Sequence, residues 1–217
     1  MTIYREERQQ LIDCARKMER YGLVVLSGGN VSMRMPDGNF LVTPSAMGYD
    51  TMQPEDIVLV DANGNIVDGI RRPSSDSAAL LYIFNHRPDI NVVLHTHQPY
   101  ATALGLVRDE LPADFVTVID ELNGAVAVAP FTRSSDEGMG QLTVQYAGSA
   151  RAVILKHHGA MAFGKNIDQA LSAAVYLEDA CKSYLAALAT GREIAKLTAE
   201  QIAEEGEERG YYGQTKD

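Results

Sequence analysis

The amino-acid sequence predicts an α/β protein, because short apolar runs typical of strands alternate with longer segments of helical spacing. The chain has 217 residues, which fits a single domain of two or three layers covering residues 1–217. Its composition, 46% hydrophobic and 22% charged, is ordinary for a globular protein. In the first third, short strands and turns follow one another closely, which favours antiparallel pairing there.

The first half of the chain is expected to contain two helices and several short strands. Apolar residues at helical spacing predict a helix over residues 4–21, and Gly22 stands where a helix commonly ends. The later elements are strands at 39–43 and 57–60, a hairpin turn at 62–65 leading to Ile66 and Val67, a helix from Ser77 to His86 capped by Ser74 or Ser75 with Asp76 in its first turn, and a strand at 92–97.

The second half is expected to alternate helices and strands, without a repeat, a linker or a low-complexity tract. Its elements are a short helix at 100–107, a strand at 126–129, a helix capped by Ser134 or Ser135 that runs to about Tyr146, a strand leading to His158, a long helix capped by Asn166 that ends before Gly191, and a helix from Thr198 to Gly210.

The charge pattern and the apolar runs exclude several classes of partner. The formal net charge is −10 and no Lys/Arg cluster forms a stripe, so nucleic-acid binding is not expected. No apolar run approaches the length of a membrane span and the N-terminus lacks a signal-peptide pattern, so we expect a cytoplasmic protein without a membrane partner. Cys14 and Cys181 fall inside helical patterns and are expected to be reduced core residues.

Histidines follow two of the apolar runs. His95 and His97 end the first run, and side chains two residues apart on a strand project to the same side. Two such imidazoles can share one divalent ion, although a bare His-x-His is equally typical of a half-exposed strand end. The second run ends at His157 and His158, and two strands that both end in histidine favour a three-histidine metal site.

Two polar loops are candidates for anion binding. The loop Ser27-Gly28-Gly29-Asn30 allows an unusual backbone whose N–H groups can face an anion, whereas a plain turn is the alternative. Ser74 and Ser75 can likewise face an anion with Asp76 beside the metal, but helix capping alone also explains these three residues.

In chain order the motifs are Gly29-Asn30-Val31-Ser32, Thr43-Pro44-Ser45, Pro73-Ser74-Ser75-Asp76, His95-Thr96-His97 and His157-His158-Gly159. This set resembles the class II aldolase/adducin family, which includes fuculose- and rhamnulose-phosphate aldolases and L-ribulose-5-phosphate 4-epimerase. The resemblance covers nearly the whole chain. It implies a three-layer α/β/α fold around a mostly antiparallel sheet. It also implies a Zn²⁺ site, or a site for another divalent transition metal, and a cyclic homotetramer with active sites between subunits.

Carried over by position, the resemblance implies that His95, His97 and His158 are the metal ligands and that His157 points elsewhere. It implies that Asp76 completes the metal sphere or acts as a base. The phosphorylated ketose is implied to bind through a set of small and polar residues, namely Ser27, Gly28, Asn30, Thr43, Ser45, Ser74 and Ser75.

Four positions bear on which family member the chain resembles. The aldolases have a catalytic Glu at the position of Asp76, where the epimerases have Asp. The aldolases' catalytic Tyr corresponds to Val116, whereas the catalytic Asp and C-terminal catalytic Tyr of the epimerases correspond to Asp120 and Tyr212. These positions favour a pentulose-phosphate 4-epimerase over an aldolase.

Two other positions depart from the epimerase pattern. Thr43 replaces a loop lysine, and Ala46 replaces the family's usual glycine, so the phosphate pocket or a positive-φ turn is expected to differ.

Both reactions imply cleavage of the C3–C4 bond of a ketose with metal stabilisation of the enediolate. In the epimerase reaction the aldehyde recombines through its other face, with Asp120 and Tyr212 of a neighbouring subunit as proton-transfer groups. In the aldolase reaction the fragments leave, and Asp76 takes the Glu role with a shorter side chain. The third alternative is a non-catalytic adducin-like scaffold, which the retained histidines disfavour.

Overall fold

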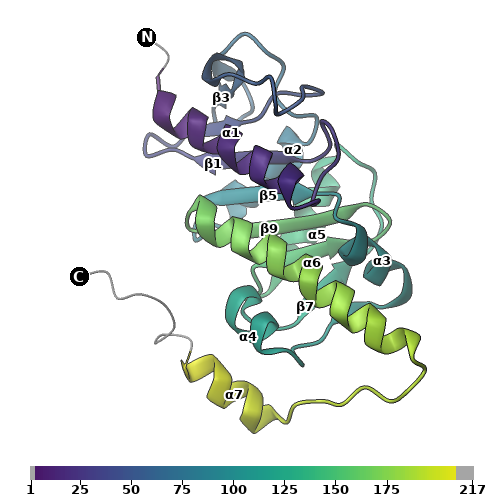
Figure 1. Ribbon diagram of the computed structural model, residues 1–217. Coiled ribbons are helices and arrows are strands. Elements are labelled where there is room, and N and C mark those ends of the chain that lie inside the picture. The colour runs from purple at the N-terminus through teal and green to yellow at the C-terminus, as the bar shows by residue number, and fades with distance from the viewer. Residues whose placement is uncertain (1–2, 209–217) are drawn as a thin grey trace.

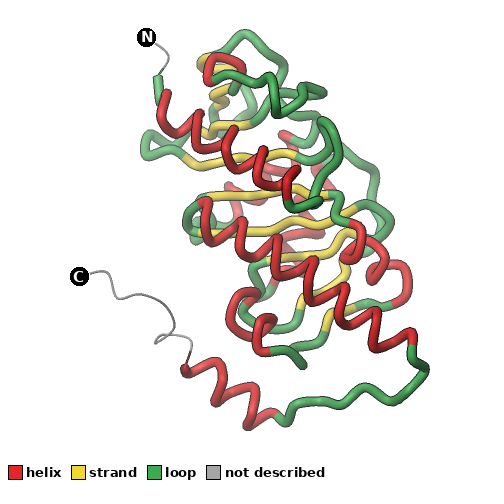
Figure 2. The backbone as a smooth tube through the Cα atoms, viewed as in Figure 1, coloured by secondary structure: helices red, strands yellow, loops and turns green. Residues whose placement is uncertain are grey.

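The computed structural model describes residues 3–208, which form a central sheet between layers of helices (Figures 1 and 2). The strands are β1 (Asn30–Arg34), β2 (Phe40–Val42), β3 (Val58–Val60), β4 (Ile66–Asp68), β5 (Val92–Thr96), β6 (Glu110–Leu111), β7 (Val126–Ala129), β8 (Ala152–Leu155) and β9 (Gly159–Gly164). The helices are α1 (Arg5–Arg20), the 3₁₀ turn η1 (Pro54–Asp56), α2 (Ser77–His86), α3 (Pro99–Val107), α4 (Val116–Leu122), α5 (Glu137–Ala147), α6 (Ile167–Ala189) and α7 (Ala199–Glu208).

The strands follow the order β4-β3-β2-β1-β5-β9-β8-β7-β6. Strands β7 and β8 pair in parallel, and the other pairs recorded for the described residues are antiparallel. The expectation of a mostly antiparallel sheet is therefore confirmed, including the antiparallel pairing predicted for the first third of the chain.

Helices cover both faces of the sheet and bury two separate hydrophobic cores (Figure 1). Helices α1, α3, α4 and α6 contribute to one core, and α2 and α5 contribute to the other. Alternation along β5 divides its side chains between them, with Val92 and Leu94 in the first core and Val93 in the second. This three-layer α/β/α architecture confirms the predicted fold class.

Strand β5 occupies the middle of the sheet and is buried along its whole length. Its neighbours are β1, which pairs Asn30 with His95, and β9, which pairs Met161 with His95. Because the apolar residues of β5 are held between two antiparallel neighbours, the direction of the side chains at its end is fixed by the sheet.

The elements expected from the sequence agree with the structure to within a few residues, except at two helix N-termini, whereas β1, β6, β9 and α4 have no counterpart among the expected elements. Asp136, whose side chain accepts from the Gly138 N–H, caps α5, so the expected cap at Ser134 or Ser135 is wrong. Asp76 lies at the N-cap position of α2 rather than in its first turn, and Ser74 Oγ accepts from the Asp76 N–H. In both cases a serine upstream of the helix was a suitable cap by residue type, and the aspartate next to the first turn occupies the position instead.

The long helix confirms its expected cap. The side chain of Asn166 accepts from Gln169 N–H at 2.9 Å, which satisfies one free donor of the first turn, and Gln169 Oε1 reaches back to accept from the N–H of Lys165, just before the cap, at 2.9 Å. None of the helices in the described part of the chain combines the length and the hydropathy that a membrane span needs.

Candidate metal centre

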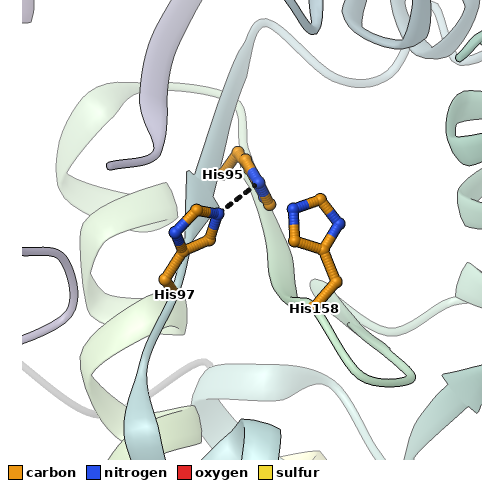
Figure 3. A group of neighbouring side chains, drawn as sticks. All are labelled: His95, His97 and His158. Carbon is orange, nitrogen blue, oxygen red and sulfur yellow. Dashed lines mark hydrogen bonds between the residues drawn. The ribbon is translucent and has the colours of Figure 1, made fainter. Parts of the chain in front are cut away.

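Three imidazoles from two distant segments converge in the middle of the sheet, where β5 ends and β9 begins (Figure 3). One ring nitrogen of each of His95, His97 and His158 lies within 4.8 Å of the others. His95 Nε2 and His97 Nε2 lie 3.1 Å apart. The ring centroid of His158 lies 4.7 Å from that of His95 and 5.1 Å from that of His97. The predicted grouping of these three residues is what the structure shows, and the three could hold a metal ion.

The sheet positions these histidines. His95 is the fourth residue of β5 and projects to the same face as Val93, toward the layer of α2 and α5. His97 directly follows the strand, and its N–H donates to Leu23 O at 3.0 Å. His158 lies in the turn between β8 and β9, where its N–H donates to Leu155 O at 3.0 Å.

The neighbouring histidine does not join the group. His157 adopts a left-handed backbone with φ of 62° and is exposed, with its ring 6.1 Å from that of Phe131. His157 therefore points away, as expected.

Two glycines allow other segments to approach the end of β5. A Cβ atom on Gly159 would lie 2.0 Å from Thr96 O, and one on Gly29 would lie 2.3 Å from His95 O. Gly29 also has φ of 73°. Because no side chain fits at either position, the 27–30 loop and the start of β9 can both pack against the backbone that carries the histidines.

Burial keeps the histidines in the form that binds metal. It lowers the pKa of the His95 imidazole to about 3, and it also lowers the pKa of His97 and of His158. His95 Nδ1 lies 3.1 Å from Ala160 O, which accepts a hydrogen bond only from a protonated Nδ1, so Nε2 is left with its lone pair.

The spacing of these nitrogens fits a divalent ion. Two nitrogens bound to one tetrahedral metal at about 2.0–2.1 Å lie roughly 3.3 Å apart, close to the 3.1 Å between His95 Nε2 and His97 Nε2. Imidazole nitrogens suit zinc and other divalent transition metals. The three residues therefore fit the metal that the family resemblance implies.

The lowered pKa of His95 predicts acid sensitivity of the metal-free protein. Its unfolded-state pKa is 6.5, above the folded value of about 3, so below pH 6.5 the unfolded chain binds a proton that the folded chain does not. Stability present above pH 6.5 is therefore lost as the pH falls, by up to about 1.4 kcal/mol per pH unit for this one proton. Urea unfolding of the chelator-treated protein at pH 7 and pH 5 measures this loss of stability. Equal free energies of unfolding at the two pH values would contradict a lowered pKa of His95 in the metal-free protein.

Asp76 and Asn30 lie beside the histidines. Asp76 Oδ2 is 3.9 Å from His95 Nε2 and accepts a hydrogen bond from Asn30 Nδ2 at 2.9 Å. Asn30 Nδ2 also donates to Ser74 Oγ at 3.1 Å, whereas Asn30 Oδ1 is buried without a hydrogen-bond partner among the described residues. The structure thus places a buried carboxylate at the edge of the three-histidine group, with its orientation fixed by a neutral amide.

A cavity of about 270 Å³ opens next to this group. Its lining is mainly small and polar, and consists of Ser27, Gly28, Gly29, Pro44, Ser45, Ala46, Ser74, Ser75, Asp76, His97, Ser134, Ser135 and His158. None of these described lining residues is Lys or Arg. The cavity brings together most of the residues that the family motifs single out.

Sequence reasoning missed three residues around this cavity. Ser134 and Ser135 line it from the loop before α5, although their composition suggested only a helix cap. The hydroxyl of Tyr49 lies 3.0 Å from Gly28 O and 2.9 Å from Gly29 O and shares its one hydrogen between them, which holds the glycine loop in place. No motif signals these contacts, because each joins segments that only the folded chain brings together.

Two expected site residues lie away from this cavity, and a third is not among the described residues. Thr43 is buried, its hydroxyl accepts from the Val31 N–H at 3.2 Å, and it does not appear in the cavity lining. Asp120 lies on α4, which is placed away from α3 and the end of β5 (Figure 1), and it is absent from the cavity lining. Tyr212 falls outside the described residues.

Ala46 keeps a backbone that favours glycine, with φ of 55°. The left-handed region costs a residue with a Cβ about 1–2 kcal/mol, and the extra entropy of glycine in the unfolded chain offsets roughly half of this. We therefore expect Ala46→Gly to raise the free energy of unfolding by about 0.5–1 kcal/mol in thermal or urea unfolding. Ala62, exposed and absent from the positive-φ residues of the described chain, is the control, and Ala62→Gly should lower stability. A lower stability of Ala46→Gly would contradict the strain at this position.

The fold and site define an α/β protein with a candidate divalent-metal centre beside a polar cavity. Residues 9–185 match the family model described as Class II Aldolase and Adducin N-terminal domain, and the chain belongs to this family. An L-fuculose phosphate aldolase of Haemophilus influenzae is 32% identical over 197 residues, or 91% of this chain and 90% of the relative.

A second similar protein and a solved structure are also named as aldolases. A 5-deoxy-D-ribulose 1-phosphate aldolase of Bacillus thuringiensis is 31% identical over 184 residues, or 84% of this chain and 85% of the relative. Among solved structures, an L-fuculose 1-phosphate aldolase has a TM-score of 0.87 at 30% identity, covering 93% of this chain and 94% of that one. The family and fold inferred from the motifs are confirmed.

Proposed function

We propose that the protein is a metal-dependent aldolase that cleaves the C3–C4 bond of a phosphorylated ketose, such as L-fuculose 1-phosphate. The observation that carries this proposal is the grouping of three neutral histidines and Asp76 beside one polar cavity, which His97, His158 and Asp76 line. The names of the similar proteins support it, because they are an L-fuculose phosphate aldolase, a 5-deoxy-D-ribulose 1-phosphate aldolase and, among solved structures, an L-fuculose 1-phosphate aldolase. The sequence pattern favoured the epimerase, and these relatives shift the preference to the aldolase.

The proposed ligands are His95, His97 and His158, with zinc as the first candidate metal. A divalent ion there supplies Lewis-acid stabilisation of the negative charge that develops on the ketose oxygens as the bond breaks. The histidines contribute by staying neutral, which leaves the charge of the ion undiminished. Asp76 Oδ2, at the edge of this group, is proposed to move the proton to and from C3.

The phosphate is proposed to bind through neutral donors. Ser27, Ser45, Ser74 and Ser75 offer hydroxyls in the cavity, and Gly28, whose N–H donates to Val25 O at 3.0 Å, forms part of its wall. Since no Lys or Arg appears among the described lining residues, hydrogen bonds from these donors would carry the recognition. Thr43 is proposed to act indirectly, because its hydroxyl is bonded to the Val31 N–H.

A pentulose-phosphate 4-epimerase of the L-ribulose 5-phosphate type is the second candidate. Asp76 in place of Glu supports it, and so does Asp120, whose Oδ1 is buried without a hydrogen-bond partner among the described residues. Such a carboxylate oxygen costs free energy in the folded state unless it serves a function or meets a partner. In this candidate Asp120 and Tyr212 transfer protons on opposite sides of the aldehyde oxygen.

Asp120 bears on assembly as well. It lies on α4, outside the cavity lined by His97 and Asp76 of the same chain. A site that contains all three would therefore include residues of two subunits, and a cyclic homotetramer is the proposed arrangement. A fully active monomer in size-exclusion chromatography with light scattering would contradict it.

Incubation of the metal-loaded protein with L-fuculose 1-phosphate and, separately, with L-ribulose 5-phosphate tests the proposal. The aldolase predicts a free aldehyde and dihydroxyacetone phosphate from the first substrate, and the epimerase predicts an inverted pentulose phosphate from the second. Neither product with either substrate would contradict retro-aldol chemistry on these two substrates.

Asp120→Asn separates the two candidates further. If the protein is an epimerase, this change should lower turnover of L-ribulose 5-phosphate by about 10²–10⁴-fold, because a general acid or base typically contributes that factor to the rate. The metal content should stay unchanged. If the protein is an aldolase that does not use Asp120, cleavage of L-fuculose 1-phosphate should change less than about threefold. Full epimerase turnover by the variant would remove Asp120 from the mechanism.

A further inference from the structure

We propose that Ser135 is a positioning residue that holds the Asp76 carboxylate in its working orientation, through a contact set by the close packing of α5 on α2. This inference rests on the proposed role of Asp76 in the reaction.

The contact joins two loops that are 59 residues apart in the sequence. Ser135 Oγ donates to Asp76 Oδ1 at 3.4 Å, and both side chains line the cavity. The other oxygen, Oδ2, accepts from Asn30 Nδ2 at 2.9 Å and faces His95 Nε2 at 3.9 Å. Each carboxylate oxygen therefore has its own neutral donor, and the two donors together fix the rotation of the carboxylate about its Cβ–Cγ bond.

The backbone of Ser135 is strained in a way that helix capping does not explain. Its φ is 62°, in the left-handed region that residues with a Cβ rarely adopt. The N-cap of α5 is Asp136, which accepts from the Gly138 N–H at 2.9 Å. Ser135 has no capping hydrogen bond among those recorded for the described residues, and its recorded side-chain partner is Asp76. Strain that persists at the rim of a cavity, with the side chain directed at a buried carboxylate, points to a functional constraint.

Helix packing brings the two residues together. A Cβ on Gly140 would lie 2.4 Å from Ala79 O and 2.9 Å from Ala79 Cα, so α5 and α2 approach more closely than any other residue at position 140 would allow. Asp76 immediately precedes α2, and Ser135 lies just before α5. The glycine contact near the start of both helices therefore sets the distance between Ser135 and Asp76.

Three substitutions at Ser135 separate the hydroxyl from the backbone. Ser135→Ala and Ser135→Gly both remove the donor, but only glycine relieves the left-handed φ, whereas Ser135→Asn keeps a donor and tolerates this backbone. We expect Ser135→Ala and Ser135→Gly to lower kcat on the cleaved substrate by a similar factor, about 5- to 10-fold, with KM within about twofold and metal content unchanged. Ser135→Asn should keep kcat within about threefold of the wild type. Ser183, exposed on α6, provides the control, and Ser183→Ala should behave as the wild type.

A double-mutant cycle with Asp76→Asn tests whether the loss of kcat in Ser135→Ala arises through Asp76. If Ser135 acts through Asp76, Ser135→Ala should lower kcat less than about twofold in the Asp76→Asn background. Three results would each overturn the inference and leave the aldolase proposal standing. The first is a wild-type kcat for both Ser135→Ala and Ser135→Gly, and the second is a change in KM alone. The third is a loss of kcat in the double variant equal to the product of the two single losses. Wild-type turnover of Asp76→Asn alone would instead remove the proposed role of Asp76, and the inference with it.

Discussion

His97→Ala is expected to lose the bound metal and at least about 10³-fold in turnover, while the protein stays folded. His97 supplies one of three convergent nitrogens, with Nε2 3.1 Å from His95 Nε2, and two histidines hold a divalent ion far more weakly than three. Because His97 follows β5 and is more exposed than His95, its removal leaves the strand pairing of β5 intact. Metal analysis after gel filtration, steady-state turnover and circular dichroism measure the three outcomes.

His157 provides the matched control for this substitution. It directly precedes His158 but is exposed, with φ of 62° and its ring near Phe131. Asparagine tolerates that backbone, so His157→Asn should keep both metal and activity. Retention of about one metal ion per chain by His97→Ala, or loss of metal in His157→Asn, would contradict the ligand assignment.

Gly159→Ala is expected to have the largest effect on stability, lowering the free energy of unfolding by at least about 3 kcal/mol. The Cβ of an alanine at position 159 would lie 2.0 Å from Thr96 O and 3.2 Å from His97 Cα. Strands β5 and β9 would therefore have to separate next to the three histidines. Since both atoms belong to the backbone, no side-chain rotation relieves the overlap. Chemical denaturation measures the loss of stability, and metal analysis should show a lowered content because His158 is displaced with its neighbour.

Gly191 serves as the control for the cost of a methyl group alone. A Cβ there meets nothing within 4 Å, although φ is +67°. Gly191→Ala should therefore lower stability by only about 1 kcal/mol through its left-handed backbone. Equal losses for the two variants would show that the close approach of Gly159 to β5 is not what constrains this position.

The grouping of the three histidines could be predicted from the sequence, for physical reasons. His95 and His97 lie two residues apart at the end of a buried apolar run, and strand alternation alone places them on one side. The order of short motifs then indicates the family, and with it the three-layer fold and His158 as the third member of the group. These expectations depend on local pattern and motif order, both of which can be read directly from the chain.

Contacts between distant segments could not be predicted in the same way. Ser134 and Ser135 have the composition of a helix cap, and only the packing of α5 against α2 shows that they line the cavity. Tyr49 is an unremarkable aromatic residue in the sequence, yet its hydroxyl holds the glycine loop. Thr43 has the position of a substrate residue, but its hydroxyl is bonded to the backbone of β1. In each case tertiary packing, which a single sequence does not specify, decides the role.

Exchange of hydrogen for deuterium in dihydroxyacetone phosphate tests the proposed aldolase most directly, because it needs no knowledge of the aldehyde. Retro-aldol cleavage of a ketose 1-phosphate ends with protonation at C3, so by microscopic reversibility the protein must also remove that proton from the product. We expect the metal-loaded protein in D₂O to exchange one hydrogen at C3, as followed by NMR, and both chelation and His97→Ala to abolish the exchange. Absence of exchange by the metal-loaded protein, or equal exchange by the chelated protein, would contradict a metal-dependent aldolase at this site.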